Sequence, residues 1–135
     1  MAWTFSTAAG AITVGPTKGS GDWYTSPPNG LVPEQYDDKF VFFVDGGHFQ
    51  YYNNGLTIYP EQGYEALPFD APTDATWQLT AGGVREIVLP VGSFIGVKDS
   101  GPVYEIVSLT PESMVLSSPL LGGDGFFTLY LESTL

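Results

Sequence analysis

The chain has 135 residues, which fits one domain with a sizeable hydrophobic core and is too short for two. Fifteen acidic residues against four basic ones give a formal charge of −11, which repels phosphate backbones and anionic lipid surfaces and argues against nucleic acid as a partner. The absence of cysteine excludes disulfides and thiolate sites, and 43% apolar residues with 15% aromatics are unlike a disordered chain. No apolar run approaches the roughly 20 residues of a membrane span, so we expect no membrane insertion.

Turn-forming residues interrupt the whole chain. Seventeen glycines and eleven prolines separate short β-rich runs, and no apolar pattern of helical period lasts ten residues. The clearest strand is expected at residues 39–44, where both faces are largely apolar. Asp45-Gly46-Gly47 then suits a hairpin turn, residues 48–53 return as the partner strand, and Asn53-Asn54-Gly55 suits the next turn.

The later strands follow the same pattern of short runs between turns. They are expected at residues 76–79, 85–91, 93–97, 103–109, 114–117 and 126–131. About eight to ten short strands joined by short turns favour antiparallel pairing of sequence neighbours. We therefore predict one all-β domain over residues 1–135, an antiparallel meander barrel or a strongly bent β-sandwich.

Two segments do not fit this pattern. Residues 15–34 and 60–74 are rich in Gly, Pro and polar residues, yet they contain Trp23, Tyr24 and Tyr64. Loops of this length without regular structure are uncommon in a compact domain and often carry function. The two segments are therefore candidates for a functional role.

The catalytic residue types are sparse. His48, the one histidine, follows a predicted turn on a predicted strand and is more typical of a structural residue. Asp37 and Asp38 are adjacent, so their side chains diverge on an extended chain. The pairs Glu34 with Asp38, or Asp22 with Asp37, stay open as carboxylate pairs of the kind that glycosidases use. We expect no catalytic residues and no enzymatic activity.

Cofactor and metal motifs are absent from the sequence. No zinc or EF-hand spacing occurs, and the N-terminal glycines fit neither a dinucleotide fingerprint nor a P-loop. Asp37-Asp38 and Gly122-Gly123-Asp124-Gly125 leave calcium open, but these segments are more typical of a strand entry and a hairpin turn. We expect no cofactor and no metal.

The remaining signal is aromatic. Several Trp and Tyr residues lie in segments rich in Gly, Pro and Asn, where the core does not need them. The apolar C–H faces of sugars stack on such rings, and a Tyr or Trp combines a flat face with a polar tip. The alternative is that these rings anchor long loops onto the barrel. The residues that we expect to contact a polysaccharide or oligosaccharide are Trp23, Tyr24, Asp22, Tyr51 and Tyr52.

Three stretches carry a resemblance to a known family. They are Trp3-Thr4-Phe5, then Phe42-Phe43-Val44-Asp45-Gly46, and then Tyr104 to Thr110 with Met114 and Leu116. In this order they resemble the lipocalin-like domains of secreted bacterial proteins. Val14-Gly15-Pro16, Trp23 and Tyr36-Asp37-Asp38 are similar to a narrower group of β-domains, which accompany family 16 glycoside hydrolases and surface glycan-binding lipoproteins.

The resemblance implies a non-catalytic carbohydrate-binding module of a secreted or cell-surface polysaccharide-utilisation system, with a β-glucan as one possible ligand. It implies an extracellular or cell-surface location and a place in a longer multidomain protein. Met1-Ala2 leads straight into Trp3 without a signal peptide, which suits a piece cut from a longer precursor. Two alternatives are a small apolar ligand inside the barrel, lined by Phe40, Phe42 and Leu89, and a structural spacer domain.

Overall fold

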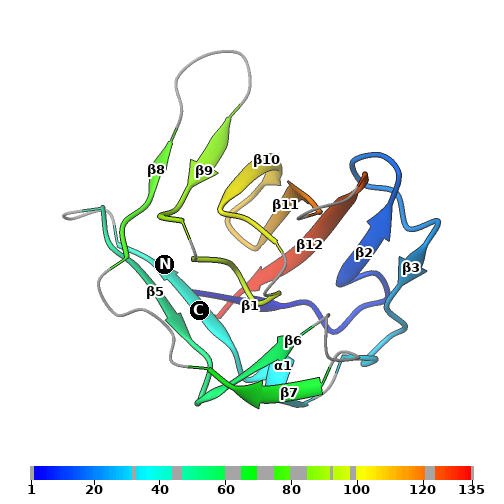
Figure 1. Cartoon of the computed structure of the whole chain (residues 1–135), viewed down its shortest axis with the longest axis horizontal. Coiled ribbons are helices and arrows are strands. Elements are labelled where there is room, and N and C mark those ends of the chain that lie inside the picture. The colour runs from blue at the N-terminus through cyan, green and yellow to red at the C-terminus, as the bar shows by residue number, and fades with distance from the viewer. Residues whose placement is uncertain are drawn as a thin grey trace.

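The computed structural model in Figure 1 describes residues 2–31, 33–43, 47–59, 65–69, 75–79, 85–91, 93–97, 100–120 and 124–134. The strands are β1 (Ala2–Phe5), β2 (Ile12–Gly15), β3 (Tyr24–Thr25), β4 (Lys39–Phe42), β5 (Phe49–Tyr52), β6 (Leu56–Tyr59), β7 (Glu65–Pro68), β8 (Gln78–Leu79), β9 (Glu86–Val88), β10 (Val103–Leu109), β11 (Ser113–Pro119) and β12 (Phe126–Ser133). One helical turn, α1 (Pro33–Tyr36), precedes β4. Among the described helices none is long and apolar enough to cross a membrane.

Ten of these strands form one antiparallel sheet. Its order is β5-β4-β1-β12-β11-β10-β9-β8, with β2 paired to β12 and β3 paired to β2, while β6 and β7 form a separate hairpin. Strands that follow one another in sequence are therefore neighbours in the sheet, apart from the inserted β2–β3 and β6–β7 pairs. This arrangement confirms the predicted all-β antiparallel meander.

The two ends of this sheet approach each other (Figure 1). The Trp77 amide donates to the Gly47 carbonyl at 2.8 Å and the Phe49 amide to the Ala75 carbonyl at 2.9 Å, on either side of a bridge between His48 and Thr76. The sheet thus curls into a barrel-like shape whose first and last strands meet over a short stretch. His48 lies at this closure, through its bridge to Thr76.

Alternation along the strands builds the core. On β12 the side chains of Phe127, Leu129 and Leu131 are buried in the core cluster, while Phe126 and Tyr130 lie on the outer face. The core residues thus alternate along this strand, while Thr128 on the outer face is buried as well.

An irregular segment at residues 93–97 fills part of the barrel interior, where a strand was predicted. Gly96 has a φ of +73°, and the Ile95 amide donates to the Tyr104 hydroxyl at 2.7 Å. A Cβ atom on Gly96 would lie 2.5 Å from the Phe5 ring and 3.0 Å from the Phe40 ring. Side chains therefore fill the interior at this point. A small apolar ligand inside the barrel would need open space here, beside Phe40.

Other predictions from the sequence agree with the structure in part. The turn at Asn54 and Gly55 is present, with φ values of 49° and 87° that suit a tight hairpin. The segments expected to lack regular structure contain β3, the start of α1 and β7; β3 gains its order by pairing with β2, and β7 by pairing with β6. The predictions for Asp45-Gly46, Tyr64, the Glu34 side chain and Gly122-Gly123 fall outside the described residues.

Candidate functional site

Trp23 and Tyr24 lie at the β3 edge of the sheet and are 55% and 43% exposed. Val14 on β2 pairs with Tyr24, and its carbonyl also accepts the Trp23 amide at 3.0 Å. The Trp23 ring packs over Gly125, where a Cβ atom would lie 2.4 Å away, so this half-exposed ring is held in place.

Tyr51 and Tyr52 are neighbours on β5 and face opposite sides of the sheet. Tyr52 is 45% exposed, whereas Tyr51 is 4% exposed and packs 5.2 Å from Phe40 and 5.6 Å from Phe94 between ring centroids. A buried ring presents no face to a ligand. Tyr51, which we had expected to contact the sugar, is therefore not part of the candidate site. Figure 1 also shows β3 and β5 on opposite sides of the barrel, so the two aromatic clusters do not form one surface.

An open cleft of about 350 Å³ lies beside Tyr52. Asp37, Lys39, Tyr52 and Asn54 line it. Lys39 begins β4 and pairs directly with Tyr52 at the end of β5, and Asn54 belongs to the turn that follows. One ring, one carboxylate, one ammonium group and one amide thus surround a space at the lower end of the usual range for small-ligand sites.

A buried polar network lies on the inner side of the same strands. The Tyr51 hydroxyl donates to Asp38 Oδ2 at 2.8 Å and lies 3.1 Å from Thr57 Oγ1. Asn53 Nδ2 donates to Thr57 Oγ1 and to the Phe69 carbonyl, both at 2.9 Å, and Asn53 Oδ1 accepts the Gly55 amide at 3.0 Å. The network therefore ties β4 and β5 to the β6–β7 hairpin.

Asp38 is the unusual member of this network. It is 1% exposed, and its Oδ1 atom has no hydrogen-bond partner among the described residues. Burial raises the pKa of Asp38 from 3.8 to about 8; the hydrogen bond from Tyr51 opposes the rise and the nearby Asp37 carboxylate adds to it. Burial and the Asp38 charge likewise raise the pKa of Tyr51 well above its usual range.

The Asp37–Asp38 pair is not spread along an extended chain as expected. The Asp37 amide donates to the Pro33 carbonyl at 3.1 Å and the Asp38 amide to the Gln35 carbonyl at 3.3 Å, so the chain is curled here. Asp37 borders the cleft and Asp38 does not. A glycosidase needs both carboxyl groups at the bound sugar, and this pair does not offer that arrangement.

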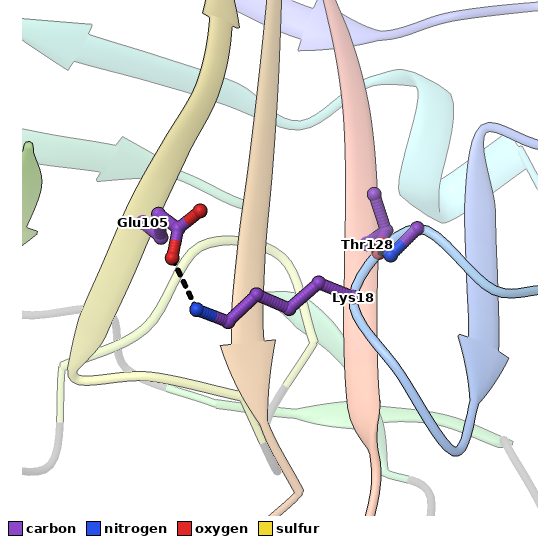
Figure 2. Close-up of polar contacts among 4 residues, drawn as sticks. Lys18, Glu105 and Thr128 are labelled. Atoms are coloured by element: carbon purple, nitrogen blue, oxygen red, sulfur yellow. Dashed lines mark hydrogen bonds and ion pairs between the residues drawn. The ribbon is translucent and has the colours of Figure 1, made fainter. Parts of the chain in front are cut away.

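A second polar cluster, the strap, covers the outer face of β12. It consists of residues 16–20 between β2 and β3. The Gly19 amide donates to Thr128 Oγ1 at 2.9 Å, and the Lys18 ammonium group forms an ion pair with Glu105 on β10. Figure 2 shows the Lys18 side chain extended across β11 to reach Glu105. The same ammonium group lies 5.8 Å from the centre of the Phe126 ring.

The strap was missed by the sequence analysis. A lysine in a loop of so acidic a chain was the available signal, but Glu105 lies 87 positions further along the chain, so the sequence does not reveal it as the partner. Thr128, beneath the strap, is fully buried. This face is closed by its own side chains, in contrast to the cleft.

Within the described ranges, no three His, Asp or Glu side chains lie close enough together to hold a metal ion. No known protein-family model matches the chain, and no curated protein sequence matches it. The resemblance to lipocalin-like domains therefore stays a prediction from the short motifs.

Proposed function

We propose that this chain is a non-catalytic carbohydrate-binding module and that the Tyr52 cleft is its ligand site. The observation that carries the proposal is the combination of the half-exposed Tyr52 ring with Asp37, Lys39 and Asn54 around one open space. A sugar ring stacks its C–H face on the aromatic ring, while its hydroxyls pair with the carboxylate, amide and ammonium groups.

The charges around the cleft favour a neutral ligand. Lys39 and Asp37 offset each other at the rim, and the buried Asp38 lies close behind them. An anionic ligand would also meet a chain with a formal charge of −11. An apolar ligand would leave the polar groups of the rim without partners. A polyhydroxylated neutral molecule satisfies both conditions.

Trp23, Tyr24 and Asp22 supply a second contact region for a long glycan. Their exposure at β3 supports this role, and because β3 and β5 lie on opposite sides of the barrel in Figure 1, we expect a short oligosaccharide to engage one region only. Service in a secreted or cell-surface polysaccharide system, a β-glucan as ligand and a place in a longer protein rest on the family resemblance alone.

The test is calorimetric titration against a panel of soluble β-glucans and their oligosaccharides. The wild-type chain is expected to bind at least one of them with a dissociation constant on the order of 1 mM or below. Tyr52→Ala is expected to weaken binding about tenfold, because it removes the stacking face.

Tyr130→Ala is the matched control for this experiment. Tyr130 is also an exposed strand tyrosine, but it lies on β12, away from the cleft. Equal losses in the two variants, or no heat with any polysaccharide, would contradict the proposal. Release of reducing sugar by the wild-type chain would replace it with an enzymatic function.

A further inference from the structure

The cleft and the buried network are carried by the same two chain segments. Asp37 and Lys39 border the cleft and flank the buried Asp38. On the facing strand, Tyr52 and Asn54 border the cleft. Tyr51 and Asn53 alternate with them along the chain and belong to the network. Because neighbouring residues share their backbone, a change in the network moves the residues of the cleft.

The hydrogen bonds of the network run in one direction. The Asn53 amide nitrogen can only donate, and it donates to Thr57 Oγ1. Thr57 Oγ1 lies next to the Tyr51 hydroxyl, which in turn donates to Asp38 Oδ2. The chain of donors therefore ends at Asp38, which receives a single hydrogen bond from the described residues, while its Oδ1 atom receives none.

A single donor does not compensate a buried carboxylate. Within the described residues, the titratable groups that face Asp38 are Asp37 from the turn after α1 and Tyr51 from β5, with Tyr104 from β10 acting on Tyr51 in turn. None of them is a cation. Lys39 begins β4 beside Asp38 but is exposed at the cleft. A neutral carboxylic acid needs fewer partners than a carboxylate, so this site suits the protonated form.

We propose that Asp38 is a positioning residue that holds the cleft in its binding shape only while its carboxyl group carries a proton, so that ligand binding is coupled to proton uptake. The coupling to a ligand rests on the proposed function, whereas the protonation of the buried acid does not. The pKa of Asp38, raised to about 8, supports the geometry and places the loss of the proton in the mildly alkaline range.

The direction of the pH effect follows from this rise. The folded chain holds the Asp38 proton up to about pH 8, whereas the unfolded chain releases it near pH 3.8. The resulting stabilisation is fully present below the unfolded value and is lost as the pH rises through the folded value. Ionised Asp38 then repels Asp37 and has a single donor, the Tyr51 hydroxyl, for its two oxygens, so the two strands that frame the cleft shift.

The ligand-free part of the test is a carbon-13 NMR titration of the Asp38 carboxyl group between pH 3 and 10. A midpoint near 8 is expected. Tyr51→Phe removes the one donor to Oδ2 and is expected to move the midpoint upward, because that hydrogen bond favours the carboxylate. A midpoint near 4 in the wild-type chain would overturn the proposal without any variant.

Two variants extend this part to stability, measured as the urea midpoint between pH 4 and 9. The wild-type midpoint is expected to fall as the pH rises, and Asp38→Asn, which mimics the neutral acid, is expected to flatten the curve. Asp124→Asn removes an exposed carboxylate instead and is expected to keep the wild-type slope. If the urea midpoint of Asp38→Asn fell with pH as steeply as that of the wild-type chain, the proposal would also be overturned.

The ligand part measures the affinity of the best-binding oligosaccharide at pH 6.5 and pH 9. One pH unit above the midpoint, about a tenfold loss is expected in the wild-type chain, and none in Asp38→Asn. A carboxyl group that titrates near 8 with a pH-independent affinity would overturn the coupling and leave the proposed function. No binding at either pH would overturn the proposed function together with the coupling, whatever the NMR midpoint.

Discussion

The cleft and the strap are built from the same kinds of group, and only one of them is open. At each place a lysine, a carboxylate and an aromatic ring come together. In the strap, Lys18 pairs with Glu105 and lies over the Phe126 ring, so the three groups satisfy one another. In the cleft, Lys39, Asp37 and Tyr52 face a shared space of about 350 Å³.

The difference teaches that residue types alone do not identify a binding site. Lys18–Glu105 is the one ion pair found within the described ranges, and it binds a loop to the sheet rather than a ligand to the protein. A site needs polar groups that the fold holds apart. At the cleft this separation comes from the strand ends and from the Asn54 turn, with the buried network behind them.

The largest effect on stability is expected from Gly96→Ala, which adds a methyl group to the filled interior behind β4. The new Cβ atom would lie 2.5 Å from the Phe5 ring at a φ of +73°, so both overpacking and backbone strain oppose it. We expect a loss of about 3 kcal/mol in the free energy of unfolding, measured by urea denaturation.

Gly19→Ala in the strap is the matched control. Gly19 has a φ of +81°, but a Cβ atom there meets no atom within 4 Å, so backbone strain alone remains, about 1 kcal/mol. Similar losses at the two glycines would show that the interior near Gly96 is looser than described.

A smaller effect is expected from Tyr51→Phe. Removal of this hydroxyl takes the donor from Asp38 Oδ2 and a partner from Thr57, both buried. We expect a loss of about 1–2 kcal/mol at neutral pH in urea denaturation. Tyr52→Phe, which removes an exposed hydroxyl from the neighbouring residue, is expected to change stability by less than about 0.5 kcal/mol. The reverse order would contradict the assignment of the two tyrosines to opposite faces.

The smallest effect on stability is expected from Lys18→Met, because both members of this ion pair contact water and such pairs contribute less than about 1 kcal/mol. Its sensitive readout is hydrogen exchange of the Gly19 amide, which donates to Thr128 and is expected to exchange faster when the strap loosens. Lys39→Met is the counterpart at the cleft. It is expected to weaken sugar binding and to leave the Gly19 exchange rate unchanged.

Much of the barrel could be predicted from local patterns. Residues 126–131 were predicted as a strand, and in the structure Phe127, Leu129 and Leu131 alternate along its buried face; Asn54-Gly55 indicated a tight turn. Both signals are local, because side-chain alternation and positive φ are properties of neighbouring residues. The closure through His48 and Thr76 joins distant segments and left no such signal.

The site was predictable only in part for the same reason. Tyr51 and Tyr52 read alike in the sequence, since β5 alternates but does not say which face is buried. The burial of Asp38 depends on its contact with Tyr51 and, through it, with Thr57 of β6, which pairs with an unpredicted strand. The exposure of Trp23 and Tyr24 agreed with the expectation, because their segment is too polar to be buried as a whole.

The most direct test of the central claim is a nitrogen-15 NMR titration of the wild-type chain with the soluble β-glucan oligosaccharides. We expect the largest shift changes at the amides of Asp37, Lys39, Tyr52 and Asn54, and no change at Lys18 and Gly19 of the closed strap. Saturating shifts confined to the strap, or no change at the four cleft residues at millimolar sugar, would contradict it.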